Sequence, residues 1–104
     1  METPYYILDG TDPVPCADVL TWSQWFEQAN RRVAETWITP TLRVATVFLG
    51  VHFHWGPEPP LLFETMVVRD DGCQEHTQRY ATWQDAEQGH RQIVETLQET
   101  FHAA

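Results

Sequence analysis

The last part of the chain has apolar residues at helical spacing. One stripe would carry Trp83, Ala86, His90, Ile93, Leu97 and Phe101, and Val94 would widen it. Thr82 precedes this stripe and Asp85 follows three residues later, which is close to a capping box. The pattern predicts a helix from Thr82 to about His102 that packs on the protein by one side. Gly89 lies inside this helix and would weaken it by about 1 kcal/mol relative to alanine.

A shorter helical stripe lies nearer the start. It consists of Val19, Trp22, Phe26 and Ala29, and Asp18 is placed to cap it. Before this helix, "PYYILDG" predicts a short strand closed by a turn. The next segment, "TDPVPC", contains too much proline for regular structure.

Between the two helices the pattern is that of strands. "RRVAETWI" and "LRVATVFLGV" are rich in β-branched and aromatic residues, and Pro40 marks a turn between them. Both faces of the second run are apolar, which predicts a central strand that is covered on both faces. "LLFETMVV" would return antiparallel to it, and Asp71-Gly72 is a turn signal before the more polar strand "EHTQRYA".

The resulting order, β-α-β-β-β-β-α, predicts a single α+β domain over residues 1–104. We expect an antiparallel four- to five-stranded meander sheet, with a short N-terminal helix and a long C-terminal helix packed on it. Because the helices would lie largely on one face, the other face is open to self-association. A homodimer or higher homo-oligomer is therefore expected.

Charge narrows the choice of partners. The 104 residues include 15 acidic residues and six arginines but no lysine, and the formal net charge is −9. Such a field repels nucleic acid, so direct nucleic-acid binding is not expected, and a basic protein partner is easier to accommodate. The alternative interpretation is that acidity only keeps a small protein monodisperse.

Two further features bear on location. Cys16 and Cys73 match no metal or redox spacing, which predicts free thiols in a reducing compartment. The N-terminus "METPYYILDG" has no secretory pattern, and no apolar run approaches the ~18 residues that a membrane span needs. A cytoplasmic protein with no membrane association is expected.

The segment "VHFHWGPEPP", residues 51–60, contains two histidines two residues apart. On a strand, His52 and His54 would point to the same side, as metal-binding pairs do. A third ligand would have to come from Glu58, Glu64 or His76. Exposed loop histidines are the simpler interpretation, so neither a metal nor another cofactor is expected. Trp55, beside a glycine, would be exposed at the tip of a hairpin.

Glu64 is the most informative ionisable residue. It falls on an apolar strand face, where a carboxylate must be paired, hydrogen-bonded or at a wet edge. Arg43 and Arg79 lie on the predicted neighbouring strands. A structural ion pair and a binding-site carboxylate are both open, whereas the chain contains no nucleophile motif and no phosphate-binding glycine loop. We therefore expect no enzymatic activity.

Several segments resemble a family of small uncharacterised proteins encoded by bacteriophages and prophage-bearing bacterial genomes. The similar segments are "YYILDG", "TWSQWFE", "RRVAET", "ATVFLG", "PPLLFETMV" and "RYATWQDAEQGH". The resemblance covers nearly the whole chain and implies a location in the host bacterial cytoplasm. Members of that family tend to carry an Asp-His pair and a glycine-rich hairpin tip, where this chain has His52 and Phe53. This departure is unfavourable to a shared metal site at the tip.

Three functional hypotheses are consistent with these features. The first is a phage-type accessory protein that binds a basic surface of a host bacterial protein, such as a component of a defence system, and inhibits it. The second is a protein that binds or sequesters an anionic nucleotide or signalling molecule through arginines and aromatics. The third is a metal-dependent enzyme that uses the hairpin histidines. The candidate binding residues are Arg43, Glu64, Arg79, Trp55, His52 and His54.

Overall fold

The computed structural model describes residues 3–53 and 56–102 of the chain. Its elements are β1 (Tyr6–Asp9), β2 (Asp12–Pro15), α1 (Val19–Gln28), β3 (Arg32–Thr39), β4 (Leu42–Phe48), β5 (Phe63–Arg69), β6 (Gln74–Tyr80) and α2 (Trp83–His102). The predicted α+β class is confirmed, and so is the helix capped by Asp18, whose side chain accepts a hydrogen bond from the Leu20 amide.

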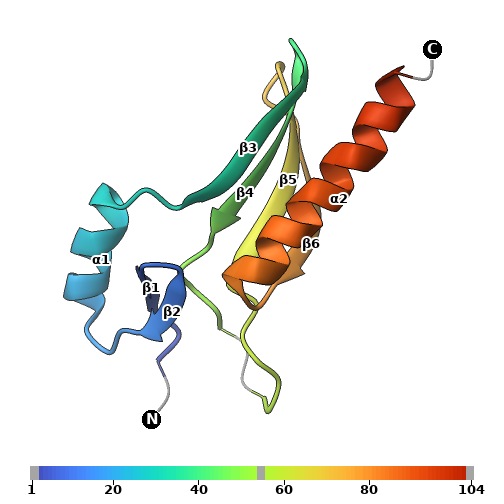
Figure 1. Ribbon diagram of the computed structural model, residues 1–104. Coiled ribbons are helices and arrows are strands. Elements are labelled where there is room, and N and C mark those ends of the chain that lie inside the picture. Colours follow the sequence, from blue (N-terminus) through green and yellow to red (C-terminus); the bar gives the residue numbers. More distant parts are fainter. Residues whose placement is uncertain (1–2, 54–55, 103–104) are drawn as a thin grey trace.

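Strands β3 to β6 form one antiparallel sheet in which each strand pairs with its neighbour along the chain. Figure 1 shows α2 lying across one face of this sheet, while α1 lies beside the small β1–β2 hairpin. The predicted meander with a long packed C-terminal helix is therefore confirmed. The expected cover on both faces of β4 is found only in part: α2 packs on one face, and on the other face Ala45 is buried but Val47 is partly exposed.

The register of the sheet is interrupted between β5 and β6. The pairing passes from Thr65 and Gln78 to Met66 and His76, which leaves Thr77 as an extra residue in β6. Such a bulge shifts the alternation of side chains by one position. Residues on either side of Thr77 that are an odd number of positions apart can therefore share a face.

The core lies between α2 and the sheet. Its buried side chains are Phe48, Leu62, Phe63, Tyr80 and Ala86. Gly89 is also buried in α2, and a methyl group built on it would overlap the ring and hydroxyl of Tyr80. The helix approaches the sheet closely here because position 89 has no side chain.

A buried polar layer joins α2 to the sheet. His90 is 4% exposed, and its two ring nitrogens hydrogen-bond the hydroxyls of Thr46 (2.8 Å) and Thr36 (2.9 Å). Thr46 also bonds Thr65 at 2.6 Å. Burial lowers the pKa of His90 because it disfavours the charged imidazolium. The histidine on the apolar stripe thus has a structural role in the core.

The N-terminal segment differs from the sequence-based expectation. Residues 12–15 form β2, which pairs antiparallel with β1, although they include Pro13 and Pro15. The amide of Cys16 donates to the Tyr5 carbonyl at 2.9 Å, and hydrogen-bonding positions alternate along such a ladder. The two prolines therefore fall at positions where no donor is required, which is why the strand tolerates them.

The strand predicted over "LRVATVFLGV" ends earlier than expected. Its last residue is Phe48, and Gly50 has a φ of 78°, which turns the backbone away from the sheet. The connection from β4 to β5 then bonds the N-terminal segment. The amide of Tyr6 donates to the Gly50 carbonyl at 2.9 Å, and the amide of His52 donates to the Pro4 carbonyl at 2.8 Å.

Candidate functional site

The face of the sheet opposite α2, the outer face, carries three of the six predicted binding residues: Arg43, Glu64 and Arg79. Strand alternation and register place on it Glu35, Trp37, Arg43, Ala45, Val47, Glu64, Met66, His76 and Arg79. Trp37 is 56% exposed there. An exposed tryptophan among charged groups is typical of a recognition surface rather than of an ordinary solvent-exposed surface.

Glu64 is the centre of the outer face. It is only 5% exposed, and each carboxylate oxygen accepts one hydrogen bond. Nε of Arg79 donates to Oε2 at 2.9 Å, and Nδ1 of His76 lies 2.8 Å from Oε1. Burial alone would raise the pKa of Glu64, but the hydrogen bonds and charges of Arg79 and His76 outweigh it and lower the pKa below its usual value. Glu64 is therefore an ionised carboxylate that holds the side chains of Arg79 and His76 in place.

The predicted carboxylate–arginine pairing is thus made by Arg79. Arg43 lies on the same face but pairs elsewhere: its Nη1 is 3.1 Å from Oε2 of Glu35, and its guanidinium lies 5.9 Å from the centre of the Trp37 ring. Arg79 thus lies beside the carboxylate of Glu64, and Arg43 lies beside the carboxylate of Glu35 and the ring of Trp37, both on an open surface. Glu35 also lies 3.7 Å from Arg32.

His76 was not among the predicted binding residues, although it completes the Glu64 cluster. In a regular strand it would face away from Arg79, three residues later. The bulge at Thr77 brings both side chains to the outer face. A bulge of this kind leaves no clear signal in the sequence, and simple alternation would place His76 on the face opposite Arg79.

The histidine pair gains no support as a metal site. His52 follows an isolated bridge residue rather than ending a strand, and its amide bonds the N-terminal segment. His54 and Trp55 lie outside the described residues. Across residues 3–53 and 56–102, no group of three or more histidine, cysteine, aspartate or glutamate side chains is arranged to hold a metal ion.

Two shallow depressions of the outer face meet at Glu64. One, of about 360 Å³, is lined by Glu64, His76, Thr77, Gln78 and Arg79. The other, of about 420 Å³, is lined by Ala29, Asn30, Arg31, Arg32, Val47, Leu49, Glu64 and Met66. The hydroxyl of Thr77 already donates to the Thr65 carbonyl. The two depressions therefore present cationic side chains that are held in place and can bind a ligand.

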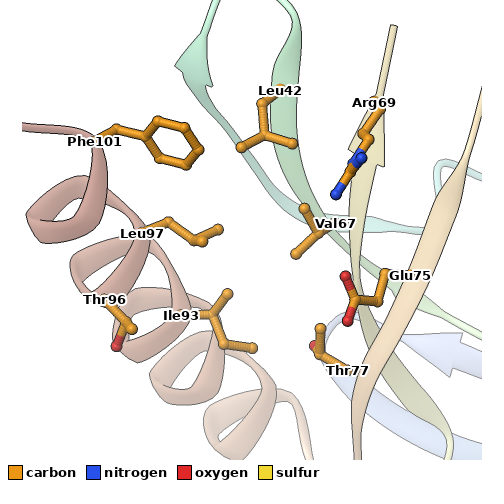
Figure 2. Close-up of a pocket in the computed structure, with 9 residues that line it drawn as sticks. All are labelled: Leu42, Val67, Arg69, Glu75, Thr77, Ile93, Thr96, Leu97 and Phe101. Atoms are coloured by element: carbon orange, nitrogen blue, oxygen red, sulfur yellow. The ribbon is translucent and has the colours of Figure 1, made fainter. Parts of the chain in front are cut away.

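A second candidate site lies on the other side of the sheet, where the C-terminal half of α2 faces β5 and β6. This apolar groove of about 310 Å³ is lined by Leu42, Val67, Arg69, Glu75, Thr77, Ile93, Thr96, Leu97 and Phe101. Figure 2 shows Ile93, Leu97 and Phe101 of the helix facing Leu42 and Val67 of the sheet. Phe101 is 48% exposed, so the groove is open at its end.

The outer face has more arginines than carboxylates among the described residues. Four arginines lie on or beside the outer face: Arg31, Arg32, Arg43 and Arg79. Glu35 and Glu64 are the described carboxylates that accompany them there. The remaining described carboxylates are Asp9, Asp12, Asp18, Glu27, Glu58, Asp70, Asp71, Glu75, Asp85, Glu87, Glu95 and Glu99, and Arg69 and Arg91 are the arginines found among them.

Comparison with known protein family models, with curated proteins and with solved structures found no match. The resemblance to phage-encoded proteins therefore stays a prediction. Neither described helix is both long and apolar enough to cross a membrane. The two sites themselves are consequently the basis for a functional proposal.

Proposed function

We propose that the protein is a non-enzymatic accessory protein of the phage type, which binds a basic surface of a host bacterial protein and inhibits it. The observation that supports this proposal most directly is the apolar groove beside α2. It is open to solvent at Phe101 and includes the carboxylate of Glu75 in its lining. A groove of this kind suits an apolar anchor that is flanked by basic residues.

The dimensions of the groove favour a side chain over a larger ligand. Its volume of about 310 Å³ is at the lower end of the range of about 300–1,000 Å³ found for ligand pockets. Binding energy in protein interfaces concentrates in a few apolar anchors that enter such pockets. The groove would therefore hold one or two apolar side chains of the partner, packed against Leu97 and Phe101.

Charge determines the kind of partner. Glu75 and Arg69 both line the groove, and the turn after Arg69 adds the two carboxylates of Asp70 and Asp71, both exposed. The groove also lies near the C-terminal end of α2, where the helix dipole carries partial negative charge. Lysine and arginine residues that flank an apolar anchor would meet these groups, and salt would weaken the attraction.

The decisive experiment is a pull-down from host bacterial lysate at low and high salt, with three baits compared side by side. The baits are the wild type, Phe101→Ser in the groove, and Leu20→Ser, which removes an exposed apolar side chain on α1. We expect the wild type and Leu20→Ser to retain a basic protein that salt releases, and Phe101→Ser to lose it. Affinity should fall about tenfold or more when the anchor contact is lost.

The captured protein is then purified and titrated against charge variants. Glu75→Gln, in the groove, should weaken binding several-fold, whereas Glu99→Gln, exposed on α2 but outside the groove lining, should leave it unchanged. The proposal is wrong if retention is the same for Phe101→Ser and wild type, or if the retained protein is acidic and salt does not release it.

A further inference from the structure

The Glu64 cluster has the construction of a prepared anion site. A buried carboxylate fixes two side chains that are themselves exposed: the side chain of Arg79 is 55% exposed and that of His76 is 57% exposed. Glu64 uses both oxygens for this purpose and is 5% exposed, so it presents little negative charge to a ligand. The exposed ends of the cluster are therefore its cationic and hydrogen-bonding groups.

The free hydrogen-bonding groups of the cluster are the terminal amino groups of Arg79, which are donors, and Nε2 of His76. Arg79 donates a hydrogen bond from Nε to Glu64, and its two terminal amino groups have no hydrogen-bond partner among the described residues. His76 must donate through Nδ1, because the ionised carboxylate of Glu64 has no proton to give. Nε2 of His76 therefore faces a ligand as an acceptor in the neutral ring and as a donor in the imidazolium. A guanidinium beside an imidazolium matches the oxygens of a phosphate group, and a neutral imidazole would accept from the hydroxyl of a monoprotonated phosphate.

The second depression extends the site beyond a single phosphate. From Glu64 it continues over Val47 and Met66 to Arg31 and Arg32. Arg31 is already engaged with the Phe26 ring, 3.9 Å from its centre, and with the Phe48 carbonyl. An apolar floor thus lies between the Arg79 and His76 pair and a second basic rim. A ligand with one phosphate and a flat apolar part would use both depressions.

The net charge of −9 acts against an anionic ligand, but its effect is limited by distance and salt. Most of the carboxylates lie away from the outer face, and the attraction or repulsion of exposed charges is screened over about 8 Å at physiological ionic strength. Four arginines on or beside the outer face act at short range. Local attraction therefore exceeds the remote repulsion.

We propose that the outer face binds a small phosphate monoester, with the phosphate held by Arg79 and His76 and the apolar part lying over Val47 and Met66. A nucleoside monophosphate has this chemistry. Glu64 is a positioning residue in this site, because it touches Arg79 and His76 and not the ligand. The site does not depend on the groove beside α2 or on any protein partner.

The test compares three probes by calorimetric titration and by the shift they cause in melting temperature: adenosine monophosphate, inorganic phosphate and adenosine. The monophosphate should bind most tightly, inorganic phosphate more weakly, and adenosine least, since phosphate contacts provide the main attraction. Equal binding of adenosine and its monophosphate would overturn the proposal. So would the absence of any shift with the monophosphate at millimolar concentration.

Variants locate the binding. Arg79→Gln should weaken the monophosphate by about tenfold or more, because a hydrogen bond to a charged group is lost. Arg91→Gln, which removes the same charge from exposed α2, should bind as the wild type does. Arg79→Gln also removes one of the two partners of Glu64 and lowers the melting temperature of the free protein, so the readout is the shift that ligand adds. An unchanged ligand shift in Arg79→Gln would overturn the proposal, whatever the groove variants do to partner binding.

Discussion

Gly89 gives a test in which packing and helix propensity predict opposite signs. On propensity alone, Gly89→Ala in the middle of α2 should stabilise the protein by about 1 kcal/mol. The structure predicts destabilisation instead. The added methyl group would overlap Cε1, Cζ and the hydroxyl oxygen of Tyr80, which is a rigid ring rather than a flexible chain end.

The magnitude follows from how little room Tyr80 has to move. It is 6% exposed and packs in the same core cluster as Phe63 and Ala86. Overpacking of a core costs about 1–3 kcal/mol. The propensity gain offsets about 1 kcal/mol of this, so Gly89→Ala should lower the free energy of unfolding by up to about 2 kcal/mol.

Urea denaturation of four proteins measures the effect as a double-mutant cycle: the wild type, Gly89→Ala, Tyr80→Phe and the double variant. The Tyr80 hydroxyl is buried without a hydrogen-bond partner among the described residues, so Tyr80→Phe should be neutral or stabilising. It also removes one of the overlapping atoms. The double variant should therefore be more stable than the two single effects predict when added.

Two results would refute the reasoning. One is a gain of about 1 kcal/mol for Gly89→Ala, which is what helix propensity alone gives. The other is strict additivity in the cycle, because residues that do not touch show no coupling beyond about 0.5 kcal/mol. Either result would mean that α2 does not approach the Tyr80 ring closely enough for a methyl group to overlap it.

Two further predictions concern ionisable groups. Because burial lowers the pKa of His90, the unfolded chain binds this proton at a higher pH than the folded protein does, and the free energy of unfolding should fall below about pH 6.5. Urea midpoints at pH 7.5 and 5.5 measure this fall. An equal fall in a His90→Gln variant would contradict the prediction. Glu64→Gln should reduce the free energy of unfolding by about 1–3 kcal/mol, since Arg79 and His76 lose an ionised acceptor, whereas exposed Glu99→Gln should change it by less than about 0.5 kcal/mol.

The predictable part of the fold is the part in which periodicity is regular. Apolar stripes at helical spacing located α1 and α2, and β-branched runs located β3 to β5, because these elements bury a face against a core. The more polar β6 followed from the turn signal at Asp71-Gly72. The short strand predicted in "PYYILDG" is found as β1, but β2 was missed because Pro13 and Pro15 indicate irregular structure. Both prolines occupy positions where the ladder needs no donor. Gly50 ended a strand that apolar alternation alone would have continued.

The candidate site was predictable to a similar extent. The position of Glu64 on an apolar strand face required a partner or a wet edge, and Arg43 and Arg79 were both candidate partners. The register of β5 and β6 places Arg79 opposite Glu64, which decides between them. His76 joined them only through the bulge at Thr77, which no local residue preference indicates. The groove beside α2 depends on how far the end of a helix diverges from a sheet, and that is a property of tertiary packing.

The long-range pairing of the N-terminal segment has a consequence for how the chain folds. Strands β3 to β6 contact their sequence neighbours, whereas Tyr6 bonds Gly50 and the Trp22 indole donates to the carbonyls of both, at 3.1 and 3.0 Å. Contacts between distant residues form late because loop closure is costly. Although residues 3–28 are synthesised before residues 48–52, they can dock only after that later segment is in place. Their amides should therefore exchange with solvent sooner than those of β4 and β5.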